Sequence, residues 1–453
     1  MRLRTTALLT TTLTAAALVP VALPATATAA PAKYADDFDG DGYRDYAAGT
    51  STADDKGGAV RVTFGTPTGP GTRTQVLTQK SPGVPGADET DDMWGDGTRV
   101  AADFNRDGYG DLVVPAVNEK VGRDEAQGAV TILWGSKKGL STGTALPNKN
   151  PQSYGNFGRD LATGDFNGDG KPDLAVVNGG DTYVHFGPLS PSGARGPVKR
   201  FDRDGAGFDA TALIAGKVTK DRATDLVVIG SVVKPGKRAA DAWFIKGGKT
   251  LKPGKTLRVD KSATEGGDGV IADFDKDGYG DIAIGNPEDS HRKGAVTVWR
   301  GGPAGPGTSV RLTQASAGIA GAPEKEDAFG SSVSAGDTDG DGYQDLAIGA
   351  PGETVNGKEY AGGVHVLRGG RGGLKGTRSQ WFARNTPGVP GELGTDDSFG
   401  RTVRLRDTDR DGHADLYVAG MDGSLRLPGS PSGTTVAGVT RLEDGEIVEG
   451  ILQ

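Results

Sequence analysis

The chain has 453 residues, including 76 glycines and 25 prolines, and a formal net charge of −8. It contains no cysteine, which excludes disulfide bonds and anchoring through a lipid-modified cysteine. It has no basic stripe with interleaved aromatic residues, so composition and charge give no support to nucleic-acid binding.

Residues 1–29 are expected to form a secretory signal peptide. Arg2 and Arg4 supply positive charge, an apolar stretch follows, and Ala27-Thr28-Ala29 offers small residues for cleavage. Threonine and proline interrupt the apolar stretch, and no later segment reaches the roughly 18–20 apolar residues of a membrane span. The sequence therefore predicts a secreted, extracellular protein without a transmembrane segment.

An acidic loop followed by a short apolar run recurs seven times along the rest of the chain. The copies are DFDGDGYRDYAAG (37–49), DFNRDGYGDLVVP (103–115), DFNGDGKPDLAVV (165–177), KVTKDRATDLVVI (217–229), DFDKDGYGDIAIG (273–285), DTDGDGYQDLAIG (337–349) and DTDRDGHADLYVA (407–419). Successive copies begin 66, 62, 52, 56, 64 and 70 residues apart. A repeat of about 60 residues holds about four short strands, which is the amount of chain in one blade of a β-propeller.

Six of these loops follow the pattern D-x-[DN]-x-D-G-x-x-D, which suits calcium. Calcium takes roughly six to eight oxygen ligands, and glycine at position six permits the sharp turn that folds the acids inward. Side chains at positions one, three, five and nine can supply oxygen, and position seven can offer its backbone carbonyl. An EF-hand would carry glutamate at position twelve, whereas these loops have Ala, Val or Ile there, on a strand. Each loop is therefore expected to join two strands.

The candidate calcium ligands are Asp37, Asp39, Asp41, Tyr43 and Asp45; Asp103, Asn105, Asp107, Tyr109 and Asp111; Asp165, Asn167, Asp169, Lys171 and Asp173; Asp273, Asp275, Asp277, Tyr279 and Asp281; Asp337, Asp339, Asp341, Tyr343 and Asp345; and Asp407, Asp409, Asp411, His413 and Asp415. One such match alone would be an ordinary surface turn. Six in register, each followed by an apolar run, favour calcium. Dockerin-type and thrombospondin-type calcium repeats share the loop but have much closer spacing.

The fourth loop is expected to bind no calcium. Lys217 replaces the first aspartate, Thr219 stands at position three and Arg222 replaces the glycine, so only Asp221 and Asp225 remain as carboxylates. We expect this loop to keep its shape, with the Lys217 ammonium directed toward Asp221 or Asp225 in place of a metal. The predicted stoichiometry is six calcium ions per chain. Loss of the two arginines in the signal changes the net charge from −8 to −10, and six Ca²⁺ would bring it to about +2.

Other elements recur with the loops. Aromatic-glycine pairs precede several of them: Trp94-Gly95, Phe157-Gly158, Phe329-Gly330 and Phe399-Gly400. Strand-like segments follow the apolar runs at 58–64, 128–134, 294–300 and 362–368, and again at 74–79, 309–314 and 379–384. The sequence therefore predicts an all-β fold, a seven-bladed β-propeller of four-stranded blades. It would form one domain over residues 30–453, with repeats starting near 34, 95, 157, 208, 265, 329 and 399. The tail at 445–453 is a candidate closing strand.

The repeat resembles the FG-GAP family, the propeller unit of integrin α-chain heads and of many bacterial secreted proteins. The resemblance is carried by the Phe-Gly pairs, the acidic loop, and Gly-Ala-Pro at 349–351, with Gly-Asn-Pro at 285–287. It covers about residues 34–442 and implies a calcium-binding propeller. For function it implies adhesion or glycan recognition, with an extracellular protein or glycan as partner. A hydrolase or polysaccharide lyase on the same ring and a structural scaffold stay open as alternatives.

Little in the sequence points to catalysis. His413 lies inside a calcium loop, His185 and His365 lie in strands where a packed or surface role is expected, and His291 lies in a loop. Ligand-binding loops are expected on the ring face opposite the calcium loops. They are 50–57, 115–127, 287–294 and 351–361 within blades, and 81–95, 316–330 and 386–400 between blades. The second group reads either as a structural linker or as a ring of acids for a cationic group, a sugar or a bridging metal.

Overall fold

The computed structural model describes residues 30–50, 57–194, 196–203, 205, 207–234, 237–261, 267–442 and 446–452. The predicted signal peptide, residues 1–29, lies outside the described residues, as do residues 51–56 of the first predicted ligand-binding loop.

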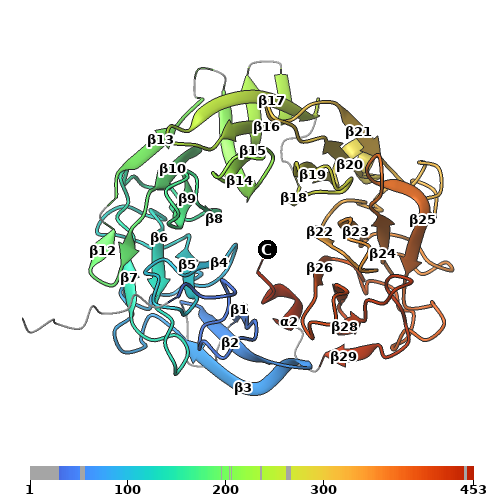
Figure 1. The fold of residues 1–453 in the computed structure, drawn as a ribbon, viewed down its shortest axis with the longest axis horizontal. Coiled ribbons are helices and arrows are strands. Elements are labelled where there is room, and N and C mark those ends of the chain that lie inside the picture. Colours follow the sequence, from blue (N-terminus) through green and yellow to red (C-terminus); the bar gives the residue numbers. More distant parts are fainter. Residues whose placement is uncertain are drawn as a thin grey trace, which may run out of the picture.

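Seven antiparallel sheets stand around a central axis and form a closed ring, the predicted seven-bladed β-propeller (Figure 1). The first blade contains β1 (Tyr46–Thr50), β2 (Ala59–Thr66) and β3 (Gly69–Leu77). The second contains β4 (Val100–Ala102), β5 (Asp111–Ala116), β6 (Ala129–Leu133) and β7 (Gly143–Ala145). The third contains β8 (Leu161–Gly164), β9 (Asp173–Asn178), β10 (Asp181–His185) and β13 (Val198–Phe201), with a hairpin of β11 (Leu189–Ser190) and β12 (Gly193–Ala194).

The remaining blades repeat this order. The fourth contains β14 (Phe208–Gly216), β15 (Asp225–Lys234), β16 (Lys237–Lys246) and β17 (Lys252–Asp260). The fifth contains β18 (Gly269–Ala272), β19 (Asp281–Asn286), a short helix α1 (Asp289–Arg292), β20 (Ala295–Trp299) and β21 (Ser309–Leu312). The sixth contains β22 (Val333–Gly336), β23 (Asp345–Ala350), β24 (Gly363–Arg368) and β25 (Lys375–Phe382). The seventh contains β26 (Thr402–Arg406), β27 (Asp415–Ala419), β28 (Ser424–Leu427) and β29 (Thr440–Leu442).

The strand after the acidic loop is buried along its whole length in several blades. In β9, β19 and β23 all six residues are buried, and their sequences DLAVVN, DIAIGN and DLAIGA are almost continuously apolar. Such a strand has a hydrogen-bonded neighbour on each side and another blade against each face, so neither set of alternating side chains meets water. The core is accordingly shared between blades: Ala283 and Val296 of the fifth blade pack in one cluster with Leu346 and Leu367 of the sixth.

The C-terminal tail closes the ring beside the first blade, which has three strands among its described residues. Its helix α2 (Glu446–Glu449) lies near β1, and the Ala47 N–H donates to the Gly450 carbonyl at 2.8 Å. The predicted closing strand is therefore wrong. One helical turn buries both Ile447 and Val448 against Tyr46 and Tyr417, whereas adjacent residues of a strand would point to opposite faces.

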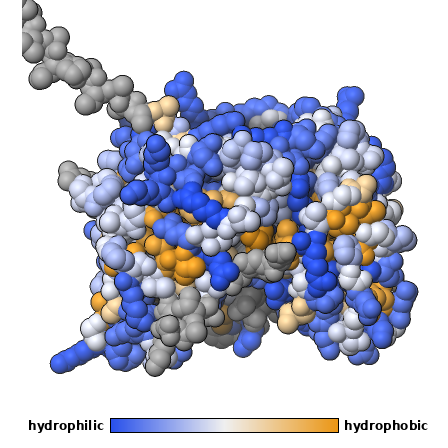
Figure 2. Space-filling model, turned by 90° about the horizontal axis from the view of Figure 1, so that it is seen from below, coloured by the Kyte–Doolittle hydropathy of each residue, from blue (hydrophilic) through white to orange (hydrophobic). Residues whose placement is uncertain are grey.

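On the side of the ring shown in Figure 2, the outer wall is mostly hydrophilic, with hydrophobic residues in separate patches at mid-height. None of the helices in the described parts of the chain has the length and apolar character needed to cross a membrane.

Candidate metal centres

Each acidic loop connects the first and second strands of its blade, or precedes β1 in the first blade. Because the strands are antiparallel, all seven loops lie on one face of the ring. The connections between second and third strands, and the linkers between blades, lie on the opposite face. The ligand-binding loops predicted within 115–127, 287–294 and 351–361 are on that opposite face, which we call the linker face.

Six loops share one hydrogen-bonding pattern. The glycine N–H at position six donates to the aspartate at position one over 2.7–3.1 Å, as between Gly42 and Asp37. The N–H at position seven donates to the aspartate at position five over 2.8–3.1 Å, as between Tyr43 and Asp41. All six position-six glycines have positive φ, from +83° to +95°, a conformation that other residues adopt at a cost. These bonds curl each loop around its own carboxylates.

The curled loops concentrate acidic oxygens. Four of them bring three carboxylates within 4.8 Å of one another: Asp37, Asp39 and Asp41; Asp273, Asp275 and Asp277; Asp337, Asp339 and Asp345; and Asp407, Asp409 and Asp411. The other two intact loops carry Asn105 and Asn167 at position three. In the described structure, Oδ1 of Asp37, Asp275 and Asp407 is buried without a hydrogen-bond donor. A buried carboxylate oxygen without a donor is costly, and a bound cation would satisfy it. The residues present therefore fit calcium.

The aspartate at position nine has a second task. In the second blade, Asp111 accepts the Phe104 N–H at 2.9 Å and the Gly135 N–H at 2.9 Å, which ties the loop to the end of β6. The equivalent carboxylates are buried in every blade. Burial raises the pKa of Asp45 and Asp111 to about 8, and that of Asp173 and Asp281 to about 6. Each carboxylate oxygen has a second lone pair, so the same side chain can hold the loop and face a metal.

Every aspartate at position three forms an ion pair with an arginine, which the loop pattern did not predict. Arg73 pairs with Asp39, Arg300 with Asp275 at 2.7 Å, Arg368 with Asp339, and Arg426 with Asp409. The two loops with asparagine at this position show no such arginine among the described contacts. Counting positions one, three, five and nine with every aspartate ionised, as a bound cation would favour, four aspartates with one arginine and three aspartates with one asparagine both give a formal charge of −3. The six sites thus present similar charge to a divalent ion.

At position seven, the four tyrosines and His413 contact the preceding loop around the ring. Lys220 lies over the Tyr279 ring at 4.4 Å, Lys276 over Tyr343 at 5.4 Å, and Arg410 over Tyr43 at 4.2 Å. A Cβ built on Gly40 would lie 2.7 Å from Tyr109, and one built on Gly340 would lie 2.7 Å from His413. The side chains of position seven therefore pack between loops, which leaves their backbone carbonyls as the groups for a metal.

The fourth loop differs from its prediction in detail. Lys217 donates to the Arg222 carbonyl, and it is Lys246 that pairs with Asp221, at 3.3 Å. Asp225 is occupied by N–H donors of Thr219 and Gly247. Arg222 does not adopt the positive φ that glycine has at position six of the other loops. Lys220 also lacks the positive φ of position four, which Arg106, Lys276 and Arg410 adopt without being glycine. The expectation that Lys217 faces a carboxylate is therefore wrong. The Lys217 ammonium donates to a carbonyl of its own turn, and Lys246 at the end of β16 pairs with Asp221 instead.

The contacts of His365 and of the linker aspartates Asp92 and Asp327 indicate structural roles. His365 is buried between Phe329 and Trp381, with ring centroids 5.3 and 4.5 Å away, and burial lowers its pKa to about 3. In the linkers, Asp92 is buried and accepts the Glu89 N–H at 2.8 Å, and Asp327 likewise accepts the Glu324 N–H. These contacts favour the structural interpretation of the repeated linkers.

Three segments of the chain match the FG-GAP repeat family, residues 157–190, 266–299 and 329–367. These segments contain the Phe-Gly pairs or acidic loops of the third, fifth and sixth blades. The chain contains FG-GAP repeats in these three blades.

Curated relatives match parts of this FG-GAP repeat protein. Phosphatidylinositol-glycan-specific phospholipase D of Mus musculus is 39% identical over 104 residues, covering 19% of this chain and 12% of the relative. The Bos taurus protein of the same name is 34% identical over 155 residues, covering 30% and 18%. Integrin alpha-5 of Xenopus laevis is 39% identical over 82 residues, covering 18% and 8%. The chain thus spans less than a fifth of the length of these relatives.

Among solved structures, one titled "Structure of Dos1 propeller" aligns with 70% of this chain and 64% of its own. The identity is 10% and the TM-score is 0.40, a level at which the likeness decides nothing about this protein.

Proposed function

We propose that this FG-GAP repeat protein is a secreted, calcium-binding propeller that recognises an extracellular protein or glycan through its linker face. The metal loops on the other face would then be structural, holding the blades that present the binding loops. The signal-like sequence at residues 1–29 supports secretion.

Calcium binding is supported by the geometry of the six curled loops. Their buried, unpartnered carboxylate oxygens on Asp37, Asp275 and Asp407 need a cation, and hard oxygen ligands suit calcium. The matched position-three arginines keep the charge of each site near −3, so that a divalent ion leaves little residual charge.

Ligand recognition is carried by one observation, the large apolar side chains exposed on the linker face. Tyr154 is 73% exposed, Met421 is 68% exposed, and Met93 and Tyr360 are each 40% exposed. They stand on two kinds of position: linkers between blades for Met93 and Tyr154, and connections between second and third strands for Tyr360 and Met421. Exposed aromatic and methionine side chains supply contact area in protein interfaces and stack on sugar rings.

The partial matches to integrin alpha-5 support an adhesive role, as the resemblance of the sequence implies. The matches to phosphatidylinositol-glycan-specific phospholipase D are equally partial, and they keep an enzyme of this architecture as the alternative.

A glycan array and a panel of hydrolase and lyase substrates, both probed with calcium-loaded protein, test the proposal. We expect saturable binding without turnover, and at least tenfold weaker binding after Tyr154→Ser combined with Tyr360→Ser. Val310→Ser is the matched control, because Val310 is 48% exposed but lies on the outer strand β21. Turnover of any substrate, or equal effects of the control and the linker-face variants, would contradict the proposed binding role.

A further inference from the structure

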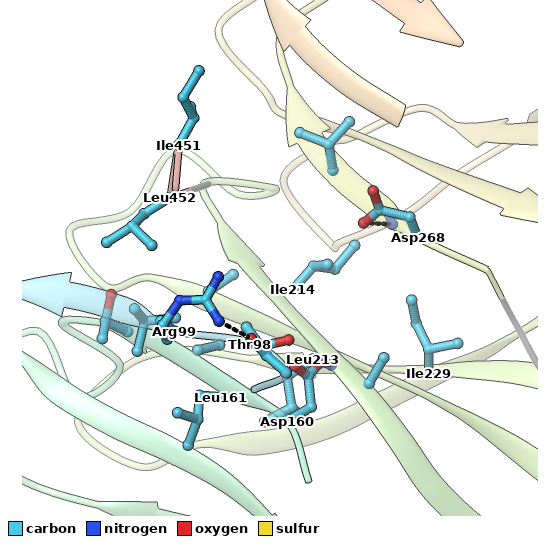
Figure 3. Close-up of a pocket in the computed structure, with 18 of the residues that line it drawn as sticks. Thr98, Arg99, Asp160, Leu161, Leu213, Ile214, Ile229, Asp268, Ile451 and Leu452 are labelled. Atoms are coloured by element: carbon cyan, nitrogen blue, oxygen red, sulfur yellow. Dashed lines mark hydrogen bonds between the residues drawn. The ribbon is translucent and has the colours of Figure 1, made fainter. Parts of the chain in front are cut away.

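A cavity of about 540 Å³ lies in the central channel of the ring, apart from the metal loops. First strands of several blades and the C-terminal tail line it, as Figure 3 shows for Leu161, Ile214, Ile451 and Leu452. Asp96 and Thr98, which are exposed, and Glu449 line it where the channel opens on the linker face. Its size is that of a small-molecule site.

The walls of this central cavity are largely apolar. Leu161, Leu213, Ile229 and Ile451 are all buried side chains of its lining. Four carboxylates and two guanidiniums also line it, so its formal charge is −2: Asp96, Asp160, Asp268 and Glu449 against Arg99 and Arg404. The cavity is therefore suited to a ligand with an apolar body and positive charge.

The two arginines are held by the protein itself. Arg99 donates to the carbonyls of Ala47 at 2.9 Å and Gly97 at 2.8 Å, and Arg404 donates to the carbonyl of Val403 at 2.8 Å. Arg404 also contacts the Ile451 carbonyl at 3.3 Å, so both guanidiniums tie the first strands and the tail together. The guanidinium groups are therefore occupied in holding the structure together, and the carboxylates are left as the charged groups for a ligand.

Asp160 is the acid of the cavity with an oxygen still able to accept a hydrogen bond. It is 7% exposed, and its Oδ2 accepts the Leu213 N–H at 2.6 Å. Its Oδ1 makes no hydrogen bond of good geometry among the described residues, although the Thr98 hydroxyl lies near enough to the carboxyl group to lower its pKa. In Figure 3 its carboxyl group lies beside Thr98 and Leu213 at the cavity wall. Asp268, by contrast, accepts N–H groups of Gly269 at 2.8 Å and Val333 at 3.3 Å.

We propose that the central cavity binds a small organic cation, an alkylammonium or alkylguanidinium, with its charged head on Asp160 and its aliphatic body against Leu161, Leu213 and Ile229. A hydrogen-bonding cation satisfies the unpartnered Oδ1, which is otherwise costly to bury. A divalent metal fits less well, since it wants roughly six oxygen ligands and the surrounding wall is aliphatic. The site is separate from the proposed ligand-binding loops and does not depend on them.

Burial raises the pKa of Asp160 to about 6, and the nearby charge of Asp268 acts in the same direction. The carboxyl group is therefore mostly ionised at pH 7.5 and mostly protonated at pH 5. Binding of a cation should weaken over that range.

The test uses hexylammonium as the probe and 1-hexanol as its neutral counterpart, titrated by calorimetry into calcium-saturated full chain at pH 7.5. We expect saturable binding of hexylammonium, and binding of 1-hexanol that is at least tenfold weaker. Asp160→Asn keeps an acceptor for the Leu213 N–H and should weaken hexylammonium binding at least tenfold. Val270→Phe, which narrows the cavity and leaves Asp160 in place, should also weaken it.

Asp289→Asn, on the short helix α1 away from the cavity, is the matched control and should bind hexylammonium as the unmodified chain does. Circular dichroism and melting of each variant show whether it is folded. Equal binding of 1-hexanol and hexylammonium would overturn the proposal, and so would unchanged hexylammonium binding by folded Asp160→Asn. A third contrary outcome is a calcium site in the cavity: calcium would displace hexylammonium, and Asp160→Asn would bind one calcium ion fewer.

Discussion

Asp277 and Asp221 occupy the same position of their loops and make the same local hydrogen bond, yet their surroundings differ. Asp277 accepts the Tyr279 N–H at 2.9 Å and lies in a group of three carboxylates. Asp221 accepts the Ala223 N–H at 3.2 Å but faces the Lys246 ammonium at 3.3 Å. The Lys246 ammonium pairs directly with the Asp221 carboxylate, whereas the Asp277 carboxylate has no ion pair among the described contacts and lies beside those of Asp273 and Asp275. The role of an aspartate therefore depends on what charge the fold brings to it.

Asp277→Ala should remove one calcium site, because it deletes a central carboxylate from an intact loop. Asp221→Ala should leave calcium binding unchanged, because its loop is expected to hold no ion. Isothermal titration with calcium measures both: we expect a stoichiometry lower by one for Asp277→Ala and unchanged for Asp221→Ala. The assignment of Asp277 as a ligand would be wrong if both variants kept the full number of sites.

Glu353 predicts a pH dependence outside the metal loops. Burial raises its pKa to about 7, although a hydrogen bond from Gln314 acts in the opposite direction. The folded state thus binds this proton more tightly than the unfolded state, whose glutamate titrates at about 4.3. The stabilising contribution is present below that value and is lost as the pH rises through about 7.

Glu353→Gln should therefore become more stable relative to the unmodified chain as the pH rises from 5 to 8. We expect the difference in melting temperature to change by about 2 °C or more, at constant calcium. Glu326→Gln, at a residue whose side chain is 46% exposed, serves as the control and should show no such trend. A flat difference across this range would show that Glu353 is ionised throughout.

Within each of the six intact acidic loops, hydrogen bonds from the backbone hold the carboxylates in place. The N–H groups at positions six and seven bind aspartates one and five, and the buried aspartate at nine ties the loop to the third strand. The outer part of the blade contributes the arginine that pairs with position three, as Arg300 does with Asp275. Hydrogen bonds thus fix the loop to its blade, and an arginine far from the loop in sequence offsets part of its negative charge.

Arg300→Met should show that adjustment. Without the guanidinium, the four carboxylates of the fifth loop repel one another more strongly in the absence of metal and attract calcium more strongly in its presence. We expect a lower melting temperature in chelator and roughly threefold tighter calcium binding at one site. Arg311→Met, whose arginine pairs with Asp289 instead of a loop aspartate, is the control. Equal melting of the two variants in chelator would argue against a charge-setting role.

Over the whole molecule, the seven blades bury one another, and the acidic loops lie side by side on one face. Lys276, for example, donates from the fifth loop to the Asp341 carbonyl of the sixth at 3.0 Å. Loss of metal from one loop should therefore loosen its neighbours, which connects calcium to the stability of the entire ring.

Removal of calcium should lower the melting temperature strongly. An extracellular site with a dissociation constant of about 10⁻⁴ M adds about 1.4 kcal/mol at millimolar calcium, so six sites add about 8 kcal/mol. That is comparable with the total stability of an ordinary domain, about 5–15 kcal/mol. Calorimetry should count six calcium ions, and scanning calorimetry should show the shift. An unchanged melt in EDTA after confirmed metal removal, or a count of seven, would contradict these expectations.

Closure of the ring should depend on the C-terminal tail. Val448 is fully buried beside Tyr417 and Ala419. Val448→Asp places an unpaired charge there and should destabilise the protein by about 3–5 kcal/mol. Glu449→Gln on the exposed side of the same helix should cost little. Equal melting temperatures for the two variants would mean that the tail does not close the ring.

The sequence by itself determined the number of blades, their order of strands and the positions of the acidic loops. These features are local and periodic: the apolar run after the loop recurs in every repeat of about 60 residues, the glycine turn in six repeats and the aromatic-glycine pair in four. The spacing of Asp273, Asp275, Asp277 and Asp281 likewise needs only one loop to bring the carboxylates together.

Only the tertiary structure decided what lies next to these features. Arg300, Lys246 and the tail at 446–452 reach their partners across strands or across the closed ring, at separations that no local period encodes. The tail forms a helical turn instead of the predicted strand because the adjacent residues Ile447 and Val448 are both buried beside β1, and adjacent residues of a strand would point to opposite faces. The central cavity and the unpartnered oxygen of Asp160 exist only because the first strands converge on one axis.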